Sequence, residues 1–218
     1  ALHVWTSIAA RFDKPDSLVS FIKTDYTSRW GQVKKKDLYK ELQGKLGRNG
    51  KATYDYLLKL YDSLDTYEAL YSFDSSYWSS ISTDVRDEII AHRRFRIETP
   101  NAMFLAALRN WRPKEATTLI KIATSWSIRA ALSGLMGGGT AERIYGDVAA
   151  KIEEGELKTA SEVEKWFLDR DFVPSDSQFR GALLAVKDNN LTRIKYLLAK
   201  LELAYWEEVG KDIESFPA

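Results

Sequence analysis

The side chains best suited to chemistry in this chain are arginines and lysines that cluster beside aromatic rings. Three arginines surround Phe95, and a further basic group surrounds Trp111. Such a mixture suits contact with phosphate groups, supported by stacking or cation–π interaction. Three consecutive lysines after Trp30 form a second patch, which is expected to begin a helix. The residues expected to contact nucleic acid are Arg93, Arg94, Arg96, Arg109, Arg112, Lys114, Lys34, Lys35 and Lys36.

The distribution of charge favours the middle of the chain as the basic part. Residues 91–130 carry eight basic and two acidic side chains, whereas residues 131–218 carry eleven basic and sixteen acidic ones. A basic segment of this kind indicates a surface for nucleic acid or another acidic partner. The alternative interpretation is a solvated, solubilising face, or pairing of the basic segment with the acidic C-terminal part of the same chain.

Other kinds of chemistry find little support in the sequence. The chain has no cysteine and only two histidines, His3 and His92, so an HNH-type nuclease site cannot be assembled from it. Gly137–Gly139 lacks the Lys-Ser/Thr ending of a phosphate-binding loop and follows a predicted helix rather than a strand. We therefore expect no enzyme activity, no metal and no cofactor, and we expect His92 to be a helix-surface or partly buried imidazole.

The elements that carry these residues are predicted to be helices, because helical periodicity recurs and strand-like alternation is scarce. Apolar residues three and four apart form stripes that are expected to face a core. The stripes are Tyr54, Leu57, Leu58, Tyr61 and Leu64, then Leu119, Ile122, Ala123, Trp126 and Ala130, then Leu191, Ile194, Leu198, Leu201 and Tyr205. The expected fold is all-α, an irregular array of about nine to eleven helices in one large or two small subdomains.

Helix starts and a glycine run divide the predicted array. Ser161–Glu164 and Ser175–Gln178 are capping-box patterns, which mark the first turns of two helices. Gly137–Gly139 is the strongest break. The predicted domains are residues 1–135, an N-terminal helical array with the basic helix pair, and residues 140–218, a smaller acidic helical subdomain.

The sequence also predicts where the chain resides. No apolar run approaches the roughly 20 residues needed to cross a bilayer, because the best candidate contains Lys121 and Arg129. The opening Ala1–Trp5 lacks the charged and apolar regions of a signal peptide and does not begin with Met. We expect a cytoplasmic location, no membrane partner, and a chain that is one piece of a longer protein.

Several short motifs follow one another in a fixed order on the predicted helices. They begin with Asp37-Leu38-Tyr39 and Ile128-Arg129, and continue with P-x-D-x-x-F and YLL-x-x-LE patterns. The matched residues in the later motifs are Arg129, Pro174, Asp176, Phe179, Tyr196, Leu197 and Glu202. This order resembles the helical region between the two catalytic parts of GmrSD-type modification-dependent restriction proteins. Ala130 departs from that pattern, since the family has a second arginine there.

The resemblance implies a prokaryotic defence protein, a nucleotide-dependent DNA endonuclease, whose DGQQR-containing half and HNH-type nuclease part lie outside this chain. The chain would be a non-catalytic helical scaffold or relay between those flanking domains, with weak DNA contact through its basic helices. Arg129 is expected to form a structural ion pair, because an arginine among apolar residues needs a partner; the alternatives are that it caps a helix carbonyl or faces solvent. The alternative function is a freestanding all-α protein-interaction module anchored by exposed aromatic residues. The candidate anchors are Trp5, Trp30, Trp78 and Trp206.

Overall fold

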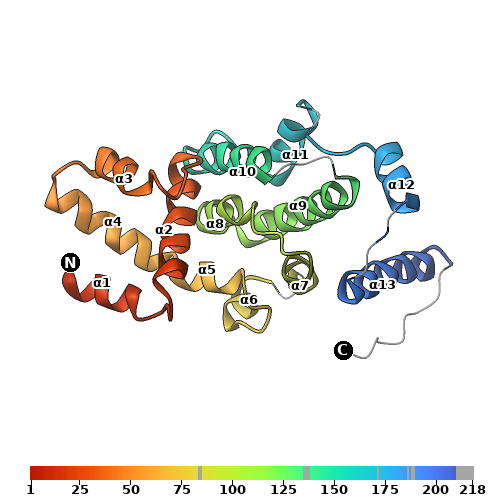
Figure 1. Cartoon of the computed structure of the whole chain (residues 1–218), viewed down its shortest axis with the longest axis horizontal. Helices are drawn as coiled ribbons and strands as arrows, with labels where there is room; N and C mark the ends of the chain where they lie inside the picture. Colours follow the sequence, from red (N-terminus) through yellow and green to blue (C-terminus); the bar gives the residue numbers. More distant parts are fainter. Residues whose placement is uncertain (83–84, 135–137, 171, 186, 188–189, 210–218) are drawn as a thin grey trace.

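The computed structural model of the chain describes residues 1–82, 85–134, 138–170, 172–185, 187 and 190–209 (Figure 1). These ranges contain helices and no strand, which confirms the predicted all-α class. The helices are α1 (Leu2–Ala9), α2 (Pro15–Trp30), α3 (Leu38–Leu46), α4 (Gly50–Asp62), α5 (Leu64–Ala69), α6 (Ser76–Ile81), α7 (Arg86–Phe95), α8 (Asn101–Asn110), α9 (Pro113–Ser133), α10 (Gly138–Glu153), α11 (Ala160–Leu168), α12 (Asp176–Ala185) and α13 (Leu191–Glu208). These thirteen helices of the described ranges exceed the nine to eleven expected, and the stripe predicted from Tyr54 to Leu64 is divided between α4 and the short α5.

Local capping chemistry explains several of the helix starts. In α12 the predicted Ser175–Gln178 capping box forms, with each side chain accepting from the backbone nitrogen of the other residue. The box predicted at Ser161–Glu164 is wrong by two residues, since the structure caps α11 with Thr159–Glu162. Thr159–Glu162 and Ser161–Glu164 both fit the Ser/Thr-x-x-Glu pattern, and the helix begins after the earlier one. Pro113 occupies the first turn of α9, where its missing N–H costs nothing.

Helix α8 lies at the centre of the fold. Its residues from Asn101 to Ala107 are all buried, and it packs against α2, α9, α10 and α5. The main core cluster extends in sequence from Ala69 to Phe172 and joins residues of α7, α8, α9, α10 and α11. The packing is therefore continuous across the boundary predicted between residues 1–135 and 140–218. Gly137, which motivated that boundary, lies outside the described residues.

The apolar stripe predicted from Tyr54 to Leu64 is only partly buried. Leu64 belongs to the second core cluster and Leu57 packs against it, as predicted. Tyr54, Leu58 and Tyr61 are exposed, whereas Tyr56 and Leu60 enter that cluster. Both sides of α4 carry large apolar residues at helical spacing, so periodicity alone does not choose between them. Only the partners of α4, which include α1 and α5, decide which side is covered.

The stripe predicted for α9 is confirmed, and the one near the C-terminus is not. Leu119, Ala123, Trp126 and Ala130 are buried on α9. Helix α13, by contrast, has no buried residue among those described. Figure 1 shows α13 at the end of the molecule opposite to α1, with α12 next to it along the chain.

Among the described helices, none is both long enough and apolar enough to cross a lipid bilayer.

Candidate nucleic-acid interface

One predicted phosphate contact, Arg109, belongs to a buried charge network. At the centre of the network, Arg29 donates to both carboxylate oxygens of Asp25, at 2.9 and 3.0 Å. Asp25 is fully buried and also accepts from the hydroxyl of Ser63 at 2.9 Å. A buried carboxylate needs such partners, because water no longer solvates its charge.

Arg109 joins this network from α8 through Glu153 at the end of α10. Its Nε and Nη2 donate to Glu153 at 3.1 and 2.8 Å, and Nη2 also contacts the Ser28 hydroxyl at 3.2 Å. Arg29 reaches the other oxygen of the same carboxylate at 3.2 Å. Burial opposes the charge of Glu153, but the two arginines and Asn110 outweigh it and hold the pKa of Glu153 below its ordinary value. Arg109 therefore links α2, α8 and α10, and its assignment as a phosphate contact stays a prediction.

The arginines at the end of α7 are arranged differently, because their side chains reach solvent. Arg93, Arg94 and Arg96 are all exposed, while Phe95 between them is buried against Ala91. Helix α7 carries acids in its first turn and cations in its last, an order that complements the helix dipole. The result is a single turn that presents three guanidinium groups on a fixed support.

The turn itself is a Schellman helix stop with an unusual residue in it. The backbone N–H of Ile97 donates to the carbonyl of His92 at 2.9 Å, and that of Arg96 donates to Arg93 at 3.3 Å. In this motif the residue at the position of Arg96 is usually glycine, because the backbone is left-handed there. Arg96 has φ 54° and ψ 44°, and is the only non-glycine residue with positive φ among those described. An L-residue in this conformation costs about 1–2 kcal/mol.

A pocket of about 290 Å³ opens beside the turn. Its lining includes Arg93 and Arg96 together with Tyr71, Glu98 and Asn101. The Asn101 amide donates to the Tyr71 hydroxyl at 3.1 Å, so this wall is held in place. Glu98 is exposed and brings negative charge to the rim. The arginine turn, formed by Arg93, Arg94 and Arg96, thus lies next to a polar pocket. The negative charge of Glu98 in this pocket would repel an anionic ligand.

His92 supports the turn from inside. Its Nδ1 lies 3.1 Å from the carbonyl oxygen of Ile97, which can only accept, and its Nε2 lies 2.6 Å from the Thr124 hydroxyl. The ring is buried and meets Phe104 edge-on, at 5.2 Å between centroids. Burial lowers the pKa of His92 to about 4, against the smaller opposite effect of its bond to Ile97. The prediction of a helix-surface or partly buried imidazole is wrong, since His92 is only 4% exposed.

The remaining predicted contacts lie apart from the turn. Arg112 and Lys114 are exposed at the start of α9, and the ten residues of α8, about 15 Å of helix, separate them from Arg96. Residues 34–36 are exposed but precede α3 rather than begin it, since that helix starts at Leu38. Lys35 is paired with Asp16. These residues therefore lie outside the turn that carries Arg93, Arg94 and Arg96, and their role as phosphate contacts stays a prediction.

The motif residues of the C-terminal part come together on two helices. Arg129 of α9 pairs with Asp176 at the start of α12, and its guanidinium lies 4.9 Å from the ring centroid of Phe179. This confirms the predicted ion pair of Arg129, with an acid whose side chain is 91% exposed. Pro174 is buried just before α12. These contacts hold α12 against α9, which is a structural role.

The last motif places one side of α13 against α7. The ring of Tyr196 meets Phe95 edge-on at 5.5 Å, and Leu197 packs on the same cluster. Glu202 is exposed and accepts from the indole of Trp206 at 3.5 Å. The side chains of Tyr196 and Leu197 thus support the arginine turn from the outside, a connection that no sequence spacing indicates.

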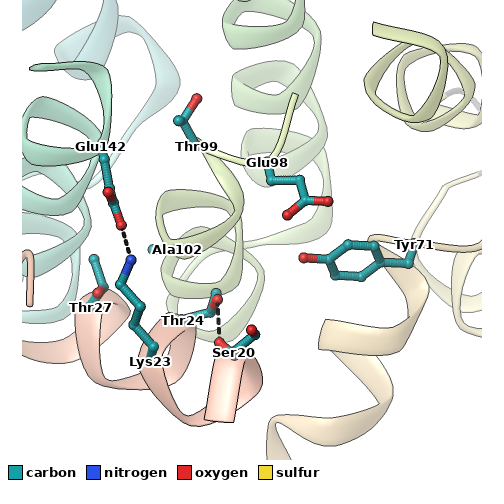
Figure 2. A pocket seen from close by; sticks show the side chains of 9 residues that line it. All are labelled: Ser20, Lys23, Thr24, Thr27, Tyr71, Glu98, Thr99, Ala102 and Glu142. Atoms are coloured by element: carbon teal, nitrogen blue, oxygen red, sulfur yellow. Dashed lines mark hydrogen bonds and ion pairs between the residues drawn. The ribbon is translucent and has the colours of Figure 1, made fainter. Parts of the chain in front are cut away.

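A second polar pocket lies between α2, α10 and the start of α8 (Figure 2). It has a volume of about 250 Å³, and the ion pair between Lys23 and Glu142 crosses one side of it. Glu98 and Tyr71 line it as well as the pocket beside the arginine turn. Sequence reasoning missed this site, because its residues come from four separate segments without a shared motif.

Two of the predicted aromatic anchors are not free to bind a partner. Trp78 is buried, and its indole donates to the carbonyl oxygens of Ala69 and Ser72. Trp30 is half-buried and packs against other aromatic rings. Trp5 is exposed and Trp206 is half-buried.

Within the part of the chain that the structure describes, no group of three or more histidine, aspartate or glutamate side chains is placed to hold a metal ion. Comparison with models of known protein families, with characterised proteins and with solved structures found no match.

Proposed function

We propose that the chain is a non-catalytic helical module that contacts nucleic acid through Arg93, Arg94 and Arg96. The observation that carries the proposal is the left-handed conformation of Arg96. Glycine would form this helix stop without the conformational cost. We infer that the Arg96 side chain makes a contact whose free energy offsets that cost. Exposure of all three guanidinium groups on one turn suits contact with adjacent phosphates.

The setting that we propose for this module is a GmrSD-like prokaryotic restriction protein, in which it holds two catalytic parts in register. This part of the proposal rests on the sequence resemblance. Its test is the coding sequence on either side of the chain, which should specify a DGQQR motif upstream and an HNH motif downstream. A flanking sequence with neither motif would leave the nucleic-acid contact standing and remove the restriction role.

The contact is tested by fluorescence anisotropy of a labelled DNA duplex titrated with the chain at 50 and 200 mM salt. Three phosphate contacts give a slope of about −2.7 in log K against log salt, or roughly 40-fold weaker binding at the higher salt. Replacing Arg93, Arg94 and Arg96 with glutamine should remove most of the binding and flatten the salt dependence. The charge-matched control replaces Lys40, Lys51 and Lys59 with glutamine, because these lysines are exposed and lie outside the predicted contacts.

Equal loss in the arginine variant and in the lysine control would mean that only net charge matters, and would refute the proposed site. Glu98→Gln offers a test in the opposite direction, because this substitution removes the acid beside Arg93 and Arg96. It should tighten binding a few-fold if phosphate approaches this turn. No change would place the DNA elsewhere.

The second candidate function, a protein-interaction module, is favoured by a different observation. Helix α13 exposes large apolar side chains to solvent, among them Leu191 and Leu198. Copurification of a specific protein partner, with no DNA binding at low salt, would support it over the nucleic-acid role.

A further inference from the structure

Helix α13 has two apolar sides, and only one of them packs on the protein. Tyr196 and Leu197 contact the cluster around Phe95, and Lys200 pairs with Asp87 of α7 at 3.3 Å. These contacts hold one side of the helix. At 100° per residue, Leu198 points about 160° away from Tyr196. Leu198 is therefore directed away from α7, whereas Leu201 lies at the border between the two sides and lines a pocket with Glu88 of α7.

That second side carries a regular stripe. Leu191, Leu198, Leu201 and Tyr205 are between 52 and 71% exposed, and Ile194 lies among them. Their spacings of three, four, three and four residues repeat every seven, which is the pattern of a helix that packs along another helix. The stripe spans fifteen residues, from Leu191 to Tyr205, or about 21 Å of helix. Single exposed leucines need no explanation, but an unbroken row of five apolar residues does.

The charges beside the stripe indicate what can cover it. Lys195 and Glu202 lie along the same edge, seven residues apart, with Leu198 midway between them. If a second α13 runs antiparallel with Leu198 at the centre, Lys195 of each chain meets Glu202 of the other, and the pair forms twice. In a parallel pair of helices, neither Lys195 nor Glu202 of one chain would lie beside an oppositely charged residue of the other chain. The edge is thus complementary to itself in one orientation only.

We propose that this protein forms a symmetric dimer in which α13 pairs antiparallel with α13 of a second copy. The two-fold axis passes near Leu198, as a dimer built from one self-complementary surface requires. Leucine and isoleucine side chains form the seam, and the two Lys195–Glu202 pairs set its direction. The contact of α13 with α7 stays intact, because it uses the other side of the helix.

The dimer is tested first by sedimentation equilibrium of the whole chain from 1 to 100 µM. The wild-type chain should change from monomer to dimer over this range. Leu198→Glu places two carboxylates at the axis and should give a monomer throughout. Leu184→Glu is the matched control, since Leu184 is 82% exposed on α12 and outside the stripe, and it should dimerise as the wild type does. A wild-type monomer at 100 µM, or a dimer indifferent to Leu198→Glu, overturns the proposal.

The direction of pairing is tested with charge variants. Lys195→Glu and Glu202→Lys each turn two attractive pairs into repulsive ones, so each should weaken dimerisation about tenfold. An equimolar mixture of the two variants makes both pairs attractive again and should form the heterodimer with wild-type affinity. A mixture that dimerises no better than either variant alone excludes the antiparallel arrangement.

Crosslinking gives an independent measure, because the chain has no cysteine of its own. Leu198→Cys should yield a covalent dimer with a short thiol-specific crosslinker. Tyr205→Cys should not, since the two copies of residue 205 lie about 21 Å apart in the antiparallel pair. Equal crosslinking of both variants indicates parallel pairing and overturns the proposal.

Discussion

The buried imidazole of His92 predicts that the chain loses stability between pH 6.5 and 4. In an unfolded chain a histidine has a pKa of about 6.5, whereas burial lowers the pKa of His92 to about 4 in the folded protein. Between pH 6.5 and 4, His92 therefore binds a proton in the unfolded state but not in the folded state. The stabilisation is fully present above pH 6.5 and falls as the pH decreases toward 4. At pH 5 the loss amounts to about 2 kcal/mol.

The contacts of the ring explain why burial, rather than a lost hydrogen bond, causes this shift. When His92 is protonated, Nε2 can donate to the Thr124 hydroxyl, which in turn can donate to the carbonyl of Ile120 at 2.7 Å. The contact with Ile97 also remains. Both polar partners are therefore satisfied in either form, and the cost lies in removing a charge from water.

The assay is urea unfolding at pH 7.5 and at pH 5.0, in a His3→Gln background that leaves His92 as the one imidazole. The matched variant is His92→Gln, which does not titrate, so contributions from carboxylates cancel in the difference between the two proteins. The parent should lose about 2 kcal/mol more than the variant between the two pH values. Equal losses would refute the reasoning, because His92 would then be as easily protonated in the folded state as in the unfolded one.

Three other changes test the packing of the helices. Gly146→Ala should destabilise the fold by about 1–3 kcal/mol, since its new methyl carbon would lie 3.0 Å from the backbone nitrogen of Gln32. Gly44→Ala has free space on α3 and should stabilise the fold by up to about 1 kcal/mol. Thermal unfolding of the two variants measures both effects. Asp25→Asn should lower the free energy of unfolding in urea by about 3–5 kcal/mol, because it leaves the buried charge of Arg29 without its partner. The exposed Asp65→Asn should lower it by under about 1 kcal/mol. Similar losses in the two variants would contradict a buried network. Tyr145→Phe should cost about 1 kcal/mol by chemical unfolding, through loss of its bond to a serine hydroxyl at 2.9 Å, and no loss would mean that this bond is unformed.

The sequence predicted the class of fold and the placement of several elements. Helical spacing over α9, with Pro113 at its start, located both the helix and its buried stripe, because a single strong periodicity has one solution there. The Ser175–Gln178 box was also found, since capping depends on residues that are close in sequence. The same local reasoning located the exposed arginines at the end of α7.

Tertiary structure decided which of several equivalent surfaces is covered. Helix α4 has apolar residues on both sides, and only the position of its neighbours exposes Tyr54 and buries Tyr56. Arg109 and Arg96 are the same residue type, so the sequence does not distinguish their roles. Arg109 pairs with Glu153 of α10 and joins the network around Asp25, whereas no acid among the described residues forms an ion pair with Arg96. Sequence determines helices because their bonds are local, whereas the partner of a charge or an apolar stripe depends on segments distant in the chain, and these meet only in the folded molecule.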